Sequence, residues 1–226
     1  VLPSIKSTLE SWGKAVVRAK DTPGFIVNRV ARPFYGEALK IIEEGIADFA
    51  TIDWAMKELG GFRMGPFELM DYIGNDVNYS ATKAVYEGTN YNPRYLPSPI
   101  QKELVEKGYL GRKSGRGYFD YSNGAISPEP DMDHELGKLI FNRILAMLIN
   151  EAADALRFEI ATREDIDTAM TTGVNYPKGL LQWADAIGIE SVLKQMKELR
   201  SNSNDLRYQP SPLLEKMGQE NTLFYS

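Results

Sequence analysis

Two stretches of the chain carry apolar residues at the spacing of an amphipathic helix. Their apolar positions recur every three to four residues: Ile26, Val30, Phe34, Ala38 and Ile41–Ile42 in the first, and Ile140, Ile144, Met147–Leu148, Ala152 and Ala155–Leu156 in the second. This spacing places the apolar side chains on one face of a helix. Both stretches are therefore predicted to be helices that pack on a core.

Proline and glycine predict where these helices bend and end. Pro33 has no N–H to donate, so the first helix should bend near Arg29. Gly45 is expected to end it, and the next helix is expected to begin at Thr51. Glycines 60–61 and Gly65–Pro66 then precede a short helix, "FELMDYIG". Three further stretches are predicted to lack helix: the loops 88–99 and 111–121 and the acidic linker 122–133.

The chain also repeats itself. Residues 28–74 align without a gap over residues 142–188, an offset of 114, and 14 of the 47 positions are identical. Unrelated sequences of ordinary composition match at about one position in sixteen. We interpret the repeat as a tandem duplication of a helical unit, too long for a solenoid repeat. Asn28/Asn142, Glu37/Glu151, Asp53/Asp167, Asp71/Asp185 and Gly74/Gly188 are kept in both copies and are candidates for structural roles.

The first twenty residues belong to neither copy. "PSIKSTLESWG" predicts a short helix that ends at Gly13, and "KAVVRAK" alternates like a strand. Because one strand cannot form a sheet, this segment indicates a partner outside the chain.

Composition excludes several classes of function. The 226 residues have a net charge of −5, which argues against nucleic acid as a main partner, and no apolar run is long enough for a membrane helix. There is no cysteine and one histidine, His134, so thiolate sites and multi-histidine metal sites are excluded. We expect a cytoplasmic protein with no metal site.

The remaining candidate chemistry is sparse. "GRKSGRG" (residues 111–117) offers glycines and cations for an anion, but lacks the strand–loop–helix context, and a loop held by packed Tyr118, Phe119 and Tyr121 is the simpler interpretation. His134 is expected at a surface or helix start, and the acidic pairs Glu43–Glu44 and Glu103–Glu106 on solvated helix faces.

Asn28 has two interpretations. An Asn at the start of a helix often caps backbone N–H groups, and Asn142 at the equivalent position favours such a structural role. However, only Asn28 follows a Pro23–Gly24 turn, which would preorganise it to reach into a site. The sequence leaves both interpretations open.

Taken in order, "KDTPGFIVNRV", "EALKIIEEG", "IDWAMKELGGFRMGPFELMDYIG" and "GRKSGRGYFDY" resemble the C-terminal domain of L-3-hydroxyacyl-CoA dehydrogenases, a family that includes the 3-hydroxybutyryl-CoA dehydrogenases. The resemblance covers residues 1 to about 121, and the rest resembles a degenerate second copy. It implies an all-α fold like the C-terminal domain of 6-phosphogluconate dehydrogenase. It also implies oxidation of a 3-hydroxyacyl-CoA to the 3-ketoacyl-CoA with NAD.

The resemblance further implies a division of labour. In the family a Rossmann domain binds NAD and supplies a His–Glu dyad, while the helical domain closes over the acyl-CoA and usually forms the dimer interface. Asn28 falls on the family's active-site Asn, and Met64, Gly65 and Pro66 are implied substrate-binding positions. The NAD loop and dyad have no counterpart here, so no catalytic or cofactor-binding residue is expected in this chain, and alone it should be inactive.

We therefore expect three regions. Residues 1–20 would be a remnant of the Rossmann domain, residues 21–124 the first unit, and residues 125–226 the second unit. The units are expected to form a pseudo-twofold pair, unless the chain forms a homodimer. Two alternatives stay open: a stand-alone helical binding or assembly module without catalysis, and a hydroxy-acid dehydrogenase with a related helical domain.

Overall fold

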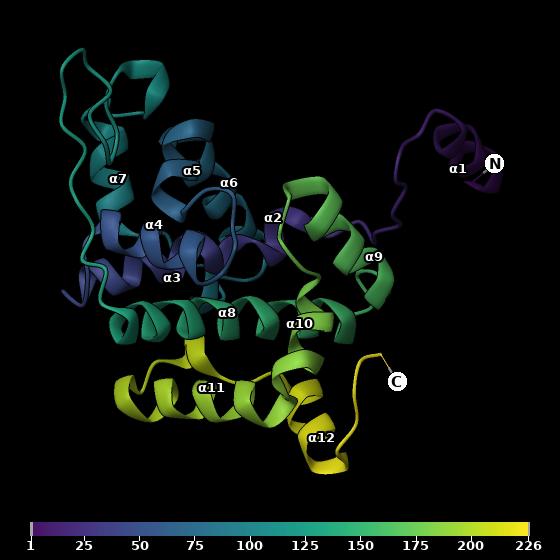
Figure 1. Ribbon diagram of the computed structural model, residues 1–226. Helices are drawn as coiled ribbons and strands as arrows, with labels where there is room; N and C mark the ends of the chain where they lie inside the picture. The colour runs from purple at the N-terminus through teal and green to yellow at the C-terminus, as the bar shows by residue number, and fades with distance from the viewer. Residues whose placement is uncertain (1, 226) are drawn as a thin grey trace.

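The computed structural model describes residues 2–225 and is built almost entirely of helices (Figure 1). The α-helices are α1 (Leu2–Ser11), α2 (Val27–Val30), α3 (Arg32–Glu43), α4 (Phe49–Glu58), α5 (Pro66–Ile73), α6 (Asn75–Gly88), α7 (Pro99–Glu106), α8 (His134–Arg157), α9 (Arg163–Thr168), α10 (Leu180–Ile187), α11 (Ile189–Ser203) and α12 (Pro212–Glu220). Short turns of 3-10 helix lie at η1 (Pro93–Tyr95), η2 (Arg112–Ser114) and η4 (Leu206–Tyr208), and a π-helical turn at η3 (Ala169–Gly173). The predicted all-α class is confirmed.

Proline explains why the two corresponding long helices differ. α2 ends at Val30 and α3 begins at Arg32, whereas α8 runs unbroken for 24 residues. Pro33 cannot donate to the carbonyl of Arg29. Its counterpart 114 residues later, Met147, donates normally inside α8. The interruption predicted near Arg29 is confirmed.

The start of α4 differs from the prediction. The helix begins at Phe49, two residues before Thr51, because Asp48 is its N-cap and its carboxylate accepts from the N–H of Thr51 at 2.8 Å. The side-chain cap satisfies an N–H that has no partner within the helix. Thr51 therefore lies in the first turn, and its hydroxyl accepts from the N–H of Asp131.

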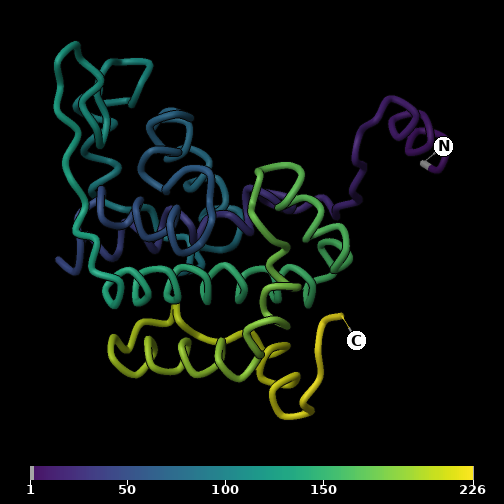
Figure 2. The backbone as a smooth tube through the Cα atoms, viewed as in Figure 1, coloured from purple at the N-terminus to yellow at the C-terminus, as the bar shows by residue number. Residues whose placement is uncertain are grey.

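The strand predicted in residues 14–20 is wrong. The helix before it forms as α1 and is followed by Gly13 in a left-handed conformation, but residues 14–20 have no regular structure. A strand needs a second strand to pair with. Within residues 2–225, the backbone of this segment makes one hydrogen bond to a distant part of the chain, from the N–H of Lys20 to the carbonyl of Ile160. α1 stands away from the other helices in Figure 2, with Trp12 68% exposed.

α8 forms the centre of the molecule. α3 and α4 pack on one side of it and α11 and α12 on the other (Figure 1). Every residue from Arg143 to Ala155 is buried, as expected for a helix with neighbours all round. No helix within residues 2–225 is long and apolar enough to cross a membrane.

Buried ion pairs link the two units around α8. Arg29 donates through Nε to Glu151 Oε1 at 2.9 Å, and Arg143 donates through Nε to Glu37 Oε1 at 2.6 Å. The hydroxyl of Tyr95 donates to Glu151, and that of Tyr208 donates to Glu37. Each contact thus occurs twice with the units exchanged.

Candidate functional site

The turn before Asn28 is strained. Gly24 has φ +81° and Phe25, which has a side chain, has φ +47°. A Cβ on Gly24 would lie 2.9 Å from the backbone N of Arg29, so this position requires glycine. The ring of Phe25 is 55% exposed. A non-glycine residue in this conformation costs free energy that the surrounding structure must compensate.

Asn28 does not cap a helix. The N-cap position of α2 is Ile26, which makes no side-chain cap bond. Asn28 lies two residues later, inside the helix, with its side chain exposed. Its neighbour Arg29, by contrast, is buried against Glu151. Asn142 is also exposed, on the surface of α8. In the repeated Asn–Arg pair the arginine therefore forms a buried ion pair, whereas the amide of Asn28 is exposed to solvent.

Gly65 and Pro66 lie at the start of α5, against Asp53. The carboxylate of Asp53 accepts from the N–H groups of Phe67 at 2.9 Å and Glu68 at 2.8 Å. A Cβ on Gly65 would lie 2.3 Å from that carboxylate. Burial raises the pKa of Asp53 to about 7, although the two N–H bonds act in the opposite direction. Close packing against Asp53 accounts for Gly65, and Pro66 is the first residue of α5, where its missing N–H needs no helical partner.

The second unit builds the same helix start with the equivalent Asp and Gly. Asp167 accepts from the N–H groups of Leu181 and Gln182, and Gly179 lies against it. Its pKa is also raised by burial. The arrangement occurs in both units, so it belongs to the fold rather than to one site.

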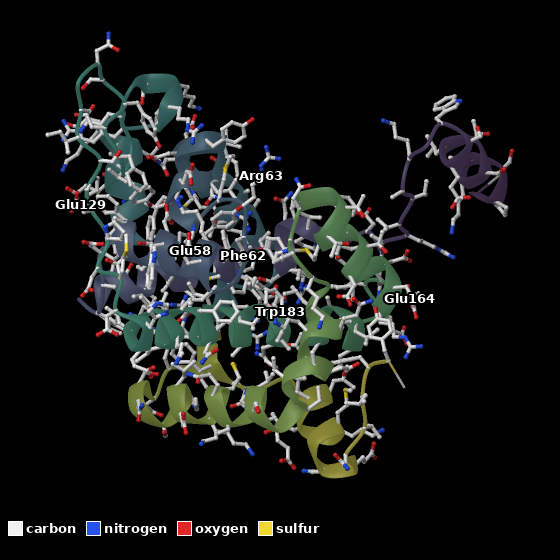
Figure 3. The ribbon with its side chains drawn as sticks, in the orientation of Figure 1. Glu58, Phe62, Arg63, Glu129, Glu164 and Trp183 are labelled. Atoms are coloured by element: carbon white, nitrogen blue, oxygen red, sulfur yellow. The ribbon has the colours of Figure 1, made fainter. Side chains whose placement is uncertain are left out.

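Met64 lines a pocket of about 400 Å³ between α5 and residues 174–176. Much of its wall is formed by Phe34, Phe62, Leu69 and Tyr72. Arg63 also lines the pocket. Figure 3 shows Arg63 and Phe62 on the side of the first unit that faces α9. Asn28 is not among the residues that line this pocket, so the pocket does not bring Met64 and Asn28 together.

The loop of residues 111–121 is held by packing, and its cations have partners. Arg112 pairs with Glu68, Lys113 pairs with Asp76, and the guanidinium of Arg116 lies 4.5 Å from the ring centroid of Tyr109. Asp71 accepts from the N–H groups of Tyr118 and Phe119. Phe119 also meets Phe49 edge to face. The packed interpretation of this loop is confirmed, and these contacts give no support to an anion site.

The other candidate residues lie at the surface or in ion pairs. His134 is the first residue of α8 and its ring meets Trp54. Glu103 and Glu106 pair with lysines on the exposed face of α7, as predicted. Glu43 and Glu44 are also exposed, as predicted, and Glu44 in addition binds the buried Arg143. Within residues 2–225 no cluster of His, Asp or Glu is arranged to hold a metal ion.

A family model described as the 3-hydroxyacyl-CoA dehydrogenase C-terminal domain matches residues 24–121 and again residues 139–224. The chain belongs to the 3-hydroxyacyl-CoA dehydrogenase family. Among family members, the 3-hydroxyadipyl-CoA dehydrogenase of Escherichia coli K12 is 34% identical over 91% of this chain. The mitochondrial hydroxyacyl-coenzyme A dehydrogenase of Sus scrofa is 42% identical over 53% of it.

Solved structures of family members show the same arrangement of helices. The crystal structure of 3-hydroxybutyryl-CoA dehydrogenase from Escherichia coli K12 superimposes with a TM-score of 0.89 over 97% of this chain, at 30% identity. This chain spans 65% of that structure, 61% of the Escherichia coli 3-hydroxyadipyl-CoA dehydrogenase and 38% of the porcine enzyme. It thus corresponds to less than two thirds of each of these dehydrogenases.

Proposed function

We propose that this chain is the substrate-binding and pairing region of an NAD-dependent 3-hydroxyacyl-CoA dehydrogenase. The reaction converts the 3-hydroxyl group of an acyl-CoA to a ketone as hydride passes to NAD. Membership of the family supports this proposal, as do relatives whose names specify 3-hydroxyadipyl-CoA and 3-hydroxybutyryl-CoA. The greater length of those relatives leaves room for an additional domain that would hold the catalytic His–Glu dyad.

The residues of this chain do not fit NAD. Dinucleotide sites are built on a parallel sheet with a glycine-rich turn before a helix. The sequence has no GxGxxG, and β pairing in residues 2–225 is limited to two isolated bridges. We therefore propose that NAD binds on the additional domain. In this proposal α1 and residues 14–20 pack on that domain, which would cover Ile5 and Trp12.

The observation that carries the proposal is the exposed amide of Asn28 beside a strained turn. The fold uses neither this amide for a cap nor the ring of Phe25 for its core. An amide N–H held on a rigid turn can donate to a substrate oxygen where negative charge develops. We propose this role for Asn28, at the seam between the helical units and the NAD-binding domain.

The two units act, in this proposal, as an internal pseudo-twofold pair that arose by duplication. The offset of 114 in the sequence, the two matches of one family model and the exchanged Arg–Glu contacts support it. In an isologous interface each contact occurs twice with the partners exchanged, because each patch meets its own equivalent. The cytoplasmic location of the protein stays a prediction.

Asn28→Ala in the full-length polypeptide tests the site, with Asn142→Ala as its matched control. Both positions are exposed and begin the repeated segment, so neither change should alter the melting temperature by more than about 2 °C. We expect Asn28→Ala to lower kcat for 3-hydroxybutyryl-CoA by about 10²-fold, the scale for one lost oxyanion donor. Asn142→Ala should be neutral. Equal kcat in both variants would contradict the role of Asn28.

A further inference from the structure

The pocket beside α5 is built from residues of both units. Its aromatic residues Phe62 and Tyr176 meet edge to face, with ring centroids 5.0 Å apart. They are equivalent positions, separated by the offset of 114. The pocket therefore lies where corresponding loops of the two units meet. Its apolar wall, which includes Phe34, Met64 and Leu69, suits methylene groups.

Arg63 brings a positive charge to this pocket without a protein anion to match it. Its side chain is exposed and, among residues 2–225, no carboxylate lies within 4.0 Å of it. The other cations near α5 behave differently, since Arg112 and Lys57 both pair with Glu68. The position equivalent to Arg63 in the second unit is Pro177. The second unit therefore has no arginine at the position equivalent to Arg63.

Tyr176 contributes its ring to the wall of the same pocket. The residue is only 6% exposed, and its hydroxyl is buried beneath that wall, with no hydrogen-bond partner among residues 2–225. Burial raises the pKa of Tyr176 well above its ordinary value, so the hydroxyl keeps its proton.

Arg32 adds a second positive charge behind the pocket wall. It is 6% exposed, yet within residues 2–225 it has no carboxylate partner, in contrast to the buried Arg29, Arg94 and Arg143. Its guanidinium donates to the carbonyl of Asn78 and lies 4.9 Å from the ring centroid of Tyr35. The charge of Arg32 acts on the pKa of Tyr176, in the lowering direction. Its counterpart is Ala146.

These features combine an apolar wall and an unpaired cation. We propose that the pocket binds the far end of a short acyl chain that terminates in a carboxylate, with Arg63 as its charge partner. The inference rests on the proposed function and names its substrate class, the monothioesters of dicarboxylic acids. The apolar wall suits the methylene groups of such a chain, and Arg63 suits its terminal carboxylate.

Calorimetric titration of the 226-residue chain tests the pocket directly. The probes are the adipyl and hexanoyl thioesters of N-acetylcysteamine, which have equal chain length and differ in the terminal carboxylate. We expect the adipyl thioester to bind about tenfold more tightly. Arg63→Gln should remove this preference, whereas Tyr176→Phe, which removes a hydroxyl buried beneath the pocket wall, should not. Arg116→Gln, which removes an exposed arginine from the 111–121 loop, should leave it unchanged.

Several results would overturn the inference. Equal affinity for the two thioesters, no heat of binding at millimolar concentration, or equal losses in Arg63→Gln and Arg116→Gln would each do so. Tighter binding of free CoA than of the adipyl thioester, lost in Arg63→Gln, would assign the cation to a phosphate instead.

Activity of the full-length polypeptide separates this inference from the proposed function. We expect Arg63→Gln to lower the ratio of kcat/KM for 3-hydroxyadipyl-CoA to that for 3-hydroxyhexanoyl-CoA by about tenfold. An enzyme active on both substrates with an unchanged ratio would reject the pocket and keep the dehydrogenase. A polypeptide inactive on both with NAD would reject the proposed function, while the calorimetric preference would still decide the pocket.

Discussion

Arg29 and Glu151 form a buried ion pair between the units, with Nε and Oε1 2.9 Å apart, and Arg143 repeats it with Glu37 at 2.6 Å. The surroundings of the two pairs differ. The guanidinium of Arg29 lies over the ring of Phe158, at 5.3 Å from the centroid. The position equivalent to Phe158 in the first unit is Glu44, whose carboxylate accepts from Arg143. The pairing surface is therefore symmetric in its central contacts and specialised around them.

Removing the charge of Glu151 should destabilise the protein strongly. Glu151 is fully buried and accepts from Arg29, Arg94 and Tyr95. In Glu151→Gln the guanidinium of Arg29 is left buried without a carboxylate. Breaking a buried ion pair from one side typically costs about 3–5 kcal/mol. We expect a loss of that size in the free energy of unfolding, measured with urea.

Glu103→Gln is the matched control for this prediction. It removes one carboxylate from the exposed pair with Lys107 on α7. Exposed pairs contribute about 0–1 kcal/mol, so the urea midpoint should hardly move. If Glu151→Gln cost no more than this control, the ion pairs between the units would not be important for stability.

Two glycine substitutions should change stability in opposite directions. In Gly65→Ala the new Cβ would meet the carboxylate of Asp53 at 2.3 Å, and the strain should cost about 1–3 kcal/mol. Gly36 lies inside α3 with nothing within 4 Å of its Cβ position, so Gly36→Ala should stabilise the helix by about 0.5–1 kcal/mol. Melting temperatures measure both. An undisturbed Gly65→Ala with impaired substrate binding would instead favour a direct substrate role for Gly65.

Asp53 should make stability fall as the pH rises. Burial raises its pKa to about 7 in the folded protein, against about 3.9 for an unfolded Asp. Between these values the folded state holds the proton more tightly, so stability decreases with pH. Asp53→Asn removes this titration. The stability of the natural chain relative to the variant should therefore decrease between pH 4 and pH 7, as measured by urea unfolding at each pH.

Asp120→Asn is the control for the sign of this effect. Asp120 is exposed, and the N–H of Ser122 holds its pKa below the usual range. The natural chain relative to Asp120→Asn should thus gain stability as the pH rises through the acidic range. A slope of the same sign for both variants would show that the burial of Asp53 does not dominate its titration.

The sequence predicted the local structure well where one residue decides it. Pro33 predicts the break between α2 and α3, and Met147 at the equivalent position permits the unbroken α8. The strand at residues 14–20 failed because alternation describes a tendency that only a neighbouring strand can stabilise. Asp48 was missed as a cap because Thr51, three residues later, also suits a helix start.

Contacts between the units were beyond the sequence. Glu37 and Glu151 stood out as repeated acids, but a repeat offers each arginine two equivalent partners. Arg29 lies eight residues from Glu37 and yet pairs with Glu151, because the units face each other. The pocket residues Arg63 and Tyr176 follow no shared period either, and only the meeting of two distant loops brings them together.

The first unit made alone, residues 21–124, should not remain a monomer. Its helix α3 is buried along α8, so removal of residues 125–226 exposes Phe34, Ala38 and Leu39 to water. Exposed apolar faces of this size drive association. We expect dimers or aggregates in size-exclusion chromatography with light scattering. A monomeric unit with a cooperative melting transition would contradict the internal pairing.

Adding residues 125–226 in trans should convert these species into a one-to-one complex, because the two units are not equivalent partners. Arg94 donates to Asp154 across the interface at 2.7 Å. In a pair of first units the position of Asp154 is taken by Lys40, 114 residues earlier, so Arg94 would face a like charge. Asp154→Lys should weaken the complex measured by calorimetry, whereas Lys194→Asp, on the exposed face of α11, should not.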